Sequence, residues 1–471
     1  MSIQNGHFSP ADPSPVHPSL TEQLAAFLAA TKSQHIPGRA LDQAQYFLLD
    51  WLGSAIAGTV THQGSILLSH AAEQKGIHSS VIGLADRTST QAAAFANGAL
   101  SHITETDDVH RGAALHPAVA VIPAALAVAE RVGASGKDFL ASVILGYEVV
   151  IRIGESVGNS HYYFWHNTST CGTFGAAAAA GWLVGLSSRQ MAWALGNAGS
   201  LSSGLWQFNE DGAMAKHLHA GHAASSGVLA AELAARDFTG TRLILEGKRG
   251  LYAATSSDPK PSAVTDGLEP GMERYKISEC VIKPFPSCRH THAPVDVALA
   301  LRDRTGITPE QVARVEIETY QATMDLTDNP NPTHEFAAKF STQYCVGAAL
   351  TLGRLTLADF GPESINDRAI QNLMRRTTLR VDPEIQARYP GEWACRITIT
   401  TTAGEQVVGS TAAPKGDPEN PLSLEELRDK FRSMLAGTQY ASRAETLIQA
   451  VAYLRTADGV QGLLPGAQSR E

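Results

Sequence analysis

Two segments rich in small residues carry most of the candidate acid–base groups of this chain. His166 lies in W-H-N-T-S-T-C-G-T-F-G, and Lys216 and His219 lie in A-M-A-K-H-L-H-A-G-H-A-A. Lys216 and His219 are three residues apart, so they share one face if this segment is helical. No acidic residue occurs from Ala213 to Gly227, and the resulting positive field would attract a small anion. This pattern indicates a buried catalytic site, although a lysine that simply faces solvent at a helix end is an alternative.

A second cluster, H-I-T-E-T-D-D-V-H-R-G-A-A-L-H-P, runs from His102 to Pro117. Its carboxylates, which include Asp107, stand close in sequence to His116. Pairing between them could tune an imidazole toward a pKa near neutrality, as acid–base catalysis requires. The same residues could instead form a helix cap with ion pairs.

A third segment, K-P-F-P-S-C-R-H-T-H, begins at Lys283 and presents Arg289, His290 and His292 with no carboxylate before Asp296. Ligand sites often lie at domain junctions, where this segment could close over the same anion. An ordinary linker stiffened by two prolines is the alternative.

Other chemistries fit the pattern less well. H-x-H occurs at residues 217–219 and 290–292, but no H-E-x-x-H motif and no cysteine pair accompanies it, so we expect no metal. Cys288 in its basic loop could act as a thiolate nucleophile, an interpretation that we rank below acid–base catalysis. No glycine-rich phosphate-binding motif follows an expected strand, so we expect no nucleotide cofactor.

Composition excludes several classes of function. The 471 residues carry a formal net charge of −9 and no basic stripe, which argues against nucleic-acid binding. Five scattered cysteines favour a reduced, cytoplasmic setting. Every apolar stretch is interrupted well before the roughly 18 residues that a membrane span needs. We therefore expect no membrane association.

Periodicity predicts helices over most of residues 20–245. One helix is expected between Asp42 and Gly53, and two more within residues 116–154, joined at 133–136. The alanine-rich run at 174–186 is expected at the centre of a helix bundle, because small side chains let helices approach closely.

The pattern changes near residue 275. Residues 312–319 alternate as a strand does, and 395–409 read as a hairpin, with helices expected at 295–302, 341–352 and 365–374. Capped amphipathic helices return after Ser423. We predict a mainly α protein with a disordered tail (1–19), a large all-helical domain that is discontinuous in sequence (20–274 and 415–465), and a smaller α+β lid domain (275–414).

Together these motifs resemble the MmgE/PrpD family, which includes 2-methylcitrate dehydratases, cis-aconitate decarboxylases and iminodisuccinate epimerase. The resemblance covers nearly the whole chain, and its most specific pieces are D-D-V-H…L-H-P, G-Y-E-V-V-I-R-I-G, W-H-N-T-S-T-C-G-T-F-G, M-A-K-H-L-H-A-G-H-A-A and K-P-F-P-S-C. It implies a helical bundle with a smaller lid, an active site between them, a homodimer, and no metal or organic cofactor.

Carried over by position, the resemblance implies a polar wall made of Asp107, His116, His166, Lys216, His219 and Lys283, with Tyr147 as a further proton carrier. We expect His116 or His166 to be the general acid or base, with Asp107 orienting an imidazole. The expected carboxylate-binding residues are Lys216, Lys283, Arg289 and His292.

The chain departs from its relatives at two places. Many relatives write D-F-D-D-T where this chain has E-T-D-D-V at 105–109, which removes a hydroxyl that could touch substrate. Some decarboxylating relatives use a lid tyrosine. Tyr320 is near that position, but Leu326 or its neighbours align with it.

We expect a cofactor-independent enzyme that removes a proton next to a carboxylate of a small di- or tricarboxylate, and whose cations stabilise the enolate-like charge. A 2-methylcitrate dehydratase-like lyase is the first hypothesis. An epimerase of an amino- or hydroxy-dicarboxylate, iminodisuccinate epimerase-like, and a cis-aconitate decarboxylase-like enzyme are the alternatives. A scaffold that only binds an anion is disfavoured, because it has no need of so many proton-carrying groups.

Overall fold

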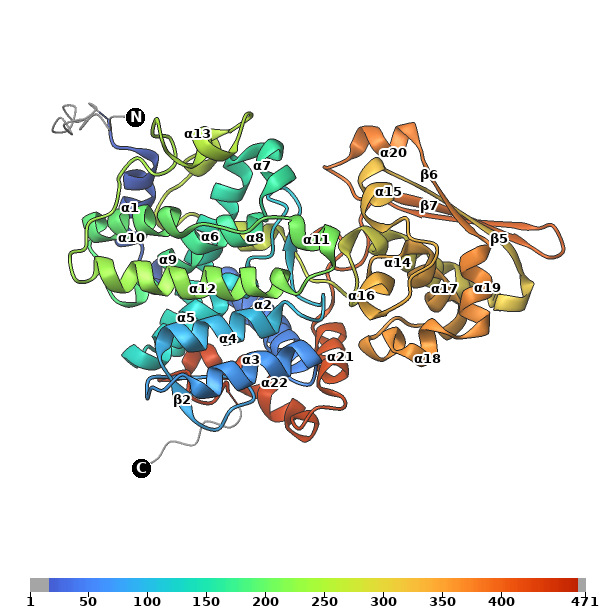
Figure 1. Cartoon of the computed structure of the whole chain (residues 1–471), viewed down its shortest axis with the longest axis horizontal. Helices are drawn as coiled ribbons and strands as arrows, with labels where there is room; N and C mark the ends of the chain where they lie inside the picture. The colour runs from blue at the N-terminus through green and yellow to red at the C-terminus, as the bar shows by residue number, and fades with distance from the viewer. Residues whose placement is uncertain (1–16, 465–471) are drawn as a thin grey trace, which may run out of the picture.

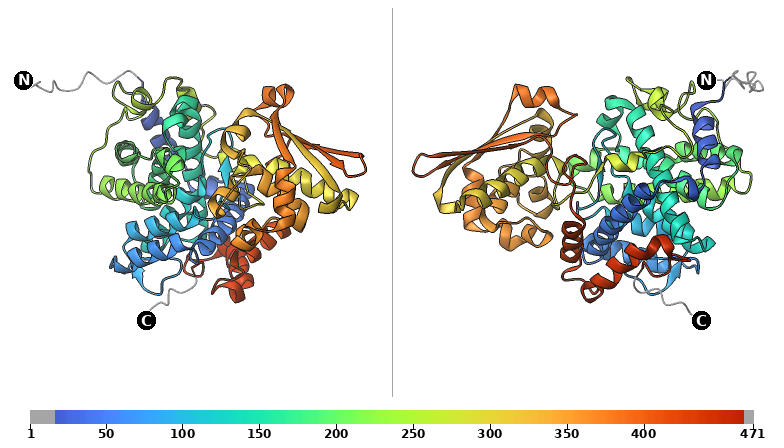
Figure 2. Two further views of the ribbon diagram at one scale, coloured as in Figure 1. Left: turned by 45° about the vertical axis from the view of Figure 1, so that its right-hand side comes forward. Right: turned by 180° about the vertical axis from the view of Figure 1, so that it is seen from behind.

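The computed structural model describes residues 17–464 and shows a large helical part beside a smaller mixed part (Figure 1). The predicted fold class, mainly α with a small mixed sheet domain, is confirmed. Most of the predicted tail, residues 1–16, and the predicted domain end at residue 465 lie outside the described residues. Both ends of the described chain lie on the helical part (Figure 2).

The helical part contains the first helices of the chain and the last two. They are α1 (Leu20–Ala30), α2 (Gly38–Gly58), α3 (His62–Glu73), α4 (Thr90–Ser101), α5 (Ala118–Val132), α6 (Gly136–Ser156), α7 (Gly158–Phe164), α8 (Asn167–Thr170), α9 (Gly172–Leu183), α10 (Ser188–Leu201), α11 (Gln207–Asp211), α12 (Ala215–Ala234), α13 (Leu251–Thr255), α21 (Leu424–Leu435) and α22 (Ala444–Tyr453). Short strands add β1 (Ser79–Ser80), β2 (Arg87–Thr88) and β3 (Val109–His110).

The alanine-rich helix α9 lies at the centre of this part, as predicted. Its residues from Gly172 to Gly181 are all buried, and it packs against α5, α6, α10 and α12. A Cβ added at Gly227 of α12 would lie 2.4 Å from the Cβ of Ala176, so the close approach of α9 and α12 requires glycine there. The predicted pair of helices in 116–154 is α5 and α6, and Gly133 ends α5 with φ 65°.

Helix α2 is longer than predicted, and Gly53 does not end it. The helix runs unbroken from Gly38 to Gly58. A Cβ at Gly53 would lie 2.3 Å from Met434 Cε and 3.0 Å from Phe431, both of α21. Gly53 therefore serves the contact between two helices that are far apart in sequence, a role that local pattern does not reveal.

The mixed part is built on a four-stranded sheet in the order β6-β5-β7-β8, in which β5 and β6 are parallel and the other pairs antiparallel. Its strands are β5 (Val312–Thr319), β6 (Thr377–Val381), β7 (Cys395–Thr401) and β8 (Gln406–Thr411), and its helices are α14 (His292–Thr305), α15 (Gln321–Thr327), α16 (Glu335–Lys339), α17 (Thr342–Leu352), α18 (Pro362–Ile365), α19 (Arg368–Arg375) and α20 (Pro383–Arg388). The predicted strand at 312–319 and the predicted hairpin are confirmed.

The two largest hydrophobic clusters correspond to the two parts. The larger runs from Leu24 to Ile282 and takes in the chain again from Leu422 to Leu464, while the other runs from Phe285 to Ile399. Along the chain, the change from the first cluster to the second thus falls between Ile282 and Phe285. The exact domain boundaries at 274 and 415 stay predictions. Within residues 17–464, no helix combines the length and apolarity that a bilayer crossing needs.

Candidate active site

A short strand pairing joins two of the predicted motifs. β3 pairs antiparallel with β4 (Cys280–Val281), which places Val109 opposite Val281. The acidic loop, residues 102–108, leads into β3, and Lys283 follows β4 by two residues. The pairing therefore brings residues that are almost 180 positions apart in sequence into contact.

Glu105 of the acidic loop binds two lysines at once. Its Oε1 accepts a hydrogen bond from Lys216 Nζ at the start of α12, and its Oε2 lies 3.3 Å from Lys283 Nζ. Burial alone would raise the pKa of Glu105, but the two ammonium groups outweigh it and hold the pKa well below its usual range. Glu105 also has φ 60°, a strained backbone conformation of the kind found at functional sites.

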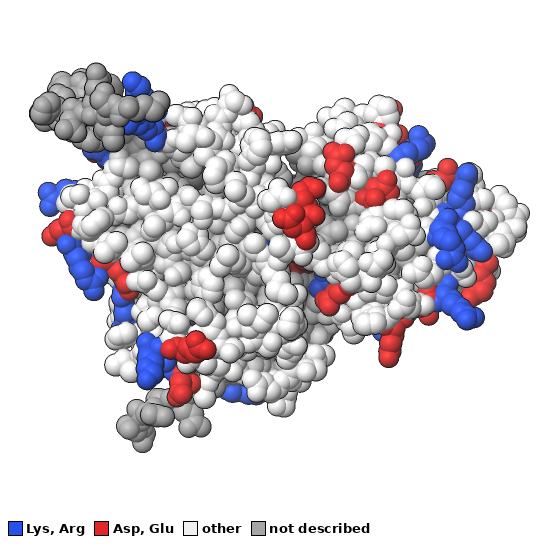
Figure 3. Space-filling view, in the orientation of Figure 1, with Lys and Arg blue, Asp and Glu red and all other residues white. Residues whose placement is uncertain are grey.

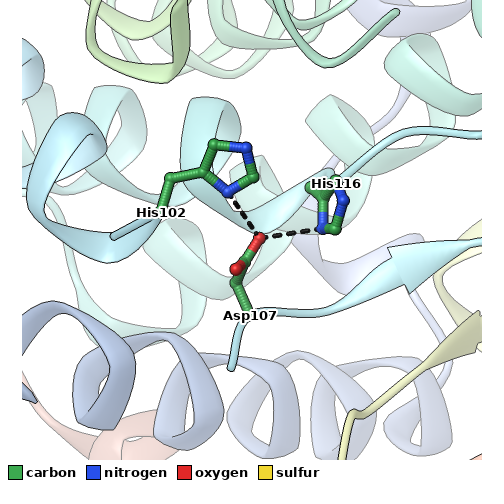
Figure 4. Close-up of side chains that lie close together, drawn as sticks. All are labelled: His102, Asp107 and His116. Carbon is green, nitrogen blue, oxygen red and sulfur yellow. Dashed lines mark hydrogen bonds and ion pairs between the residues drawn. The ribbon is translucent and has the colours of Figure 1, made fainter. Parts of the chain in front are cut away.

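Asp107 holds two imidazoles together (Figure 4). Its Oδ2 lies 2.9 Å from Nδ1 of His102 and 2.9 Å from Nδ1 of His116. Both histidines lower the pKa of Asp107 well below its usual value despite complete burial, so the carboxylate is ionised. Because an ionised carboxylate only accepts hydrogen bonds, both Nδ1 atoms must carry protons. His116 therefore has Nε2 left to meet a substrate.

His102, the other imidazole bound by Asp107, is uncharged. Burial lowers its pKa to about 3, so the ring is neutral, and its Nε2 has no hydrogen-bond partner among the described residues. The ligand atoms of His102, Asp107 and His116 lie close enough together to hold a metal ion, as do those of His110, Glu155 and Glu279. The contacts of Asp107 with both rings, together with a hydrogen bond from His116 Nδ1 to the carbonyl oxygen of Asp108 at 2.6 Å, account for the first arrangement without an ion. The expectation of no metal stays a prediction.

His166 and His219 form a second imidazole pair. Their Nδ1 atoms lie 3.2 Å apart, and the ring of His166 stacks on that of His102 with centroids 5.8 Å apart. Burial, and then the neighbouring His102 and His219, lower the pKa of His166 well below its usual value. Burial likewise lowers the pKa of His219 to about 4. Both rings are thus neutral at pH 7.

These groups surround a cavity of about 530 Å³ between the helical and mixed parts. Five predicted site residues line it, namely His116, His166, Lys216, Lys283 and Arg289. Arg289 donates from Nη2 to Asp417, whereas its Nε and Nη1 have no hydrogen-bond partner in the part of the chain that the structure describes. Unpaired buried donors are rare in native proteins, so this guanidinium is suited to bind an anion.

Four predicted residues do not line the cavity. Asp107 and His219 lie behind His116 and His166, which they contact directly. Tyr147 is fully buried, and its hydroxyl donates to Asp108 at 2.8 Å. His292 is also fully buried, with Nε2 3.2 Å from the carbonyl oxygen of Ser287. Tyr147 and His292 therefore sit in the core around the site, not at its surface.

Two lysines that sequence reasoning did not single out hold the acidic loop. Lys339 of α16 donates to the carbonyl of Thr104 at 3.3 Å, and Lys430 of α21 donates to that of Thr106 at 2.7 Å. Lys283 donates to the intervening carbonyl of Glu105 at 3.2 Å. Three consecutive carbonyls thus each accept from a lysine of a different segment. Only the tertiary structure reveals this arrangement, because isolated lysines usually face solvent.

Two further observations from the sequence concern residues of the mixed part at or near the cavity. Leu326 of α15 lines the cavity, while Tyr320 is buried and its hydroxyl lies 2.9 Å from Nδ1 of His290. Cys288 also lines the cavity, but burial raises the pKa of its thiol, which argues against a thiolate nucleophile.

The fold and this site are those of a two-part helical enzyme, and comparison with known proteins defines the class. The MmgE/PrpD N-terminal domain matches residues 22–264, and the MmgE/PrpD C-terminal domain matches residues 285–456. The chain belongs to the MmgE/PrpD family.

Its similarity to individual relatives differs in extent. The chain is 28% identical to the cis-aconitate decarboxylase of Homo sapiens over 92% of this chain and 91% of that protein. It is 27% identical to the cis-aconitate decarboxylase-like protein oryM of Aspergillus oryzae over 95% and 96% of the two chains. A 2-methylcitrate dehydratase of Escherichia coli is 30% identical, but over only 37% of each chain. These relatives bear the names of lyases, so an enzyme is supported.

Proposed function

We propose that this protein is a carboxylate lyase that decarboxylates a small unsaturated tricarboxylate of the cis-aconitate type. Relatives similar over nearly the whole chain bear the name cis-aconitate decarboxylase, whereas the dehydratase similarity is partial. This places decarboxylation ahead of the dehydratase that the sequence motifs favoured. The observation that carries the proposal is that the Asp107-bound His116 meets Lys216, Lys283 and Arg289 around one cavity.

The reaction needs two contributions from the protein. One is stabilisation of negative charge, and the other is a proton. When the carboxylate on the methylene carbon leaves as CO₂, its bonding pair forms a new carbon–carbon double bond. The electrons of the old double bond then move to the carbon beside the other terminal carboxylate, and a proton adds there. The products are CO₂ and 2-methylenesuccinate. Negative charge grows on the retained carboxylates during this step, and cations placed there lower the barrier.

Lys216 and Lys283 both contact Glu105 at the cavity wall, and Arg289 has an Nε and an Nη1 without a hydrogen-bond partner among residues 17–464. Each of these nitrogens can donate a charge-assisted hydrogen bond to a substrate carboxylate. In the free protein Glu105 neutralises part of the lysine charge and holds both ammonium groups in place. A bound substrate carboxylate would share these lysines with Glu105.

His116 is the proton donor in this proposal. Its Nδ1 is held by Asp107, so Nε2 is the atom that delivers the proton, and the ionised Asp107 stabilises the imidazolium. His166, which sequence reasoning could not separate from His116, is surrounded by His102, His219 and Lys216, and its low pKa keeps it neutral. We therefore assign His166 a substrate-positioning role.

Proton NMR in deuterated buffer tests the proposal. Incubation with cis-aconitate should yield CO₂ and 2-methylenesuccinate carrying one deuterium, and His116→Asn should abolish this turnover. His62→Asn, an exposed position on α3, serves as the matched histidine control. Water loss from 2-methylcitrate without CO₂ would instead identify a dehydratase. Hydrogen exchange in iminodisuccinate without net conversion would identify an epimerase, and the absence of any change would reject enzymatic turnover of these acids.

We also propose that the protein is a homodimer in the cytoplasm. The face formed by α3, α4 and α12 carries few charged residues over the helical part (Figure 3). It exposes apolar side chains, including Ile66 at 49% and Leu218 at 50%. An uncharged face with exposed apolar residues is typical of a protein interface. The absence of nucleic-acid partners stays a prediction from the net charge.

A further inference from the structure

The cavity has an aromatic wall that the carboxylate chemistry does not use. Rings reach it from both parts of the molecule. The aromatic subsite, as we name this wall, consists of Tyr162, Trp206, Phe208, Leu326, Tyr389 and Trp393. Helix α11 of the helical part and helix α15 of the mixed part both contribute residues to the cavity lining, and Figure 1 shows them near the junction of the two parts.

Ring contacts make each half of this wall a preformed surface. On the helical part, the ring centroid of Trp206 lies 5.1 Å from that of Tyr162 and 5.2 Å from that of Phe208. On the mixed part, Tyr389 stacks on the buried Tyr320 at 4.3 Å with an angle of 16° between the rings. Because the rings support one another, the wall needs little reorganisation to receive a ligand.

The aromatic subsite directly adjoins the polar groups. The ring of Trp206 lies 4.8 Å from that of His166, and the guanidinium carbon of Arg289 lies 6.0 Å from the ring centroid of Trp393. A substituent on the substrate skeleton would therefore reach these rings while the carboxylates stay with the cations. On α15, Ala322 lines the cavity beside Leu326 of the aromatic subsite, and Leu326 is 40% exposed.

The size of the cavity supports the same conclusion. At about 530 Å³ it lies within the range of ~300–1,000 Å³ that encloses drug-sized ligands. A six-carbon tricarboxylate is much smaller than such ligands and has no apolar group to place against six apolar or aromatic side chains. With its carboxylates held by the cations, such an acid would leave the aromatic wall without a partner.

We propose that the substrate is a polycarboxylate bearing an apolar substituent, alkyl or aryl, which the aromatic subsite binds. This inference rests on the proposed function for the position of the carboxylates and adds the substrate class to it. Each buried methylene should improve binding by roughly three- to fourfold, the equilibrium factor that corresponds to burial of one CH₂ group.

Calorimetric titration of the full-length protein with succinate, butylsuccinate, octylsuccinate and phenylsuccinate tests the proposal independently of turnover. We expect the dissociation constant to fall with chain length by roughly threefold per methylene until the chain leaves the cavity. A stronger gain for phenylsuccinate than for butylsuccinate would identify an aryl substituent, and the reverse an alkyl one.

Leu326→Ser is the discriminating variant, because a substitution at this exposed position should change the free energy of unfolding little. It should reduce the ratio of succinate to octylsuccinate dissociation constants by about tenfold. Leu424→Ser, a 49% exposed leucine on α21, is the matched control and should leave that ratio unchanged. Equal affinity across the series, or an identical chain-length gain in Leu326→Ser, would overturn the subsite. Failure of every dicarboxylate to bind would instead count against the proposed function.

Discussion

Replacement of Asp107 by asparagine tests how the site makes a proton available. The change removes one negative charge and keeps the side-chain shape. An amide oxygen in place of Oδ2 can still accept from Nδ1 of His102 and of His116, each now 2.9 Å away. The amide nitrogen takes the place of Oδ1, which has no hydrogen-bond partner among residues 17–464. The fold should therefore survive, at a cost of about 1–3 kcal/mol for one unpaired donor.

The cost to catalysis follows from the lost counter-charge. An adjacent opposite charge stabilises an ionised group by about 1–3 pKa units, and each unit is worth about 1.4 kcal/mol. An imidazolium at His116 would thus lose roughly 1.4–4 kcal/mol of stabilisation, which corresponds to about a 10- to 1,000-fold fall in kcat.

Steady-state kinetics across pH, together with thermal unfolding, measure both effects. Asp108→Asn is the matched control. Burial raises the pKa of Asp108 well above its usual value, and its carboxyl contacts the Tyr147 hydroxyl and the Ala118 N–H instead of an imidazole. Because the Asp108 carboxyl contacts no imidazole in the described chain and its raised pKa disfavours the charged form, kcat should stay within about threefold. If Asp107→Asn kept wild-type kcat, the assignment of His116 and Asp107 would be wrong.

Three further predictions concern charge and assembly. Lys216→Met should lower kcat by about 100- to 1,000-fold, because it removes one donor that stabilises the developing negative charge. Lys248→Met, at an exposed position, should leave kcat unchanged. Equal kcat values of the two variants would show that Lys216 does not belong to the site. Burial raises the pKa of Asp50 to about 6 although Lys430 opposes it, so the folded state holds this proton more tightly than the unfolded state does. The free energy of unfolding should fall by on the order of 2–3 kcal/mol as pH rises from about 4 to 6. In Asp50→Asn, chemical denaturation should show a smaller change of this free energy over the same pH range. An unchanged pH dependence in the variant would contradict the raised pKa of Asp50. Ile66→Glu should shift the sedimentation coefficient toward the monomer, while Val408→Glu on β8 should not; a dimer that persists in Ile66→Glu would place the interface elsewhere.

Much of the architecture was predictable because it is encoded in local periodicity. The strand at 312–319 and the hairpin that follows later alternate with period two, and the structure has both. The alanine run at 174–186 was correctly placed at the centre of a bundle, because a helix with many small side chains lets neighbouring helices pack closely against it. Gly53 was misjudged for the opposite reason. Its role depends on Phe431 and Met434, which local sequence does not bring near it.

The candidate site divides in the same way. Motifs spaced along the sequence indicated His116, His166, Lys216, Lys283 and Arg289, and these residues line one cavity. Motif position alone did not distinguish them from Tyr147 and His292, which occur in equally characteristic segments but point into the core.

The sequence alone determined the family, the alternation of helical and mixed segments and the kinds of groups available for catalysis, because these depend on composition and short-range order. Only the tertiary structure decided which carboxylate each cation meets. Glu105 bridges Lys216 and Lys283 because β3 pairs with β4, and Asp107 joins two imidazoles because the chain reverses at the antiparallel bridge between His110 and Leu115. Protonation follows from burial and from these neighbours, and both are properties of the folded chain.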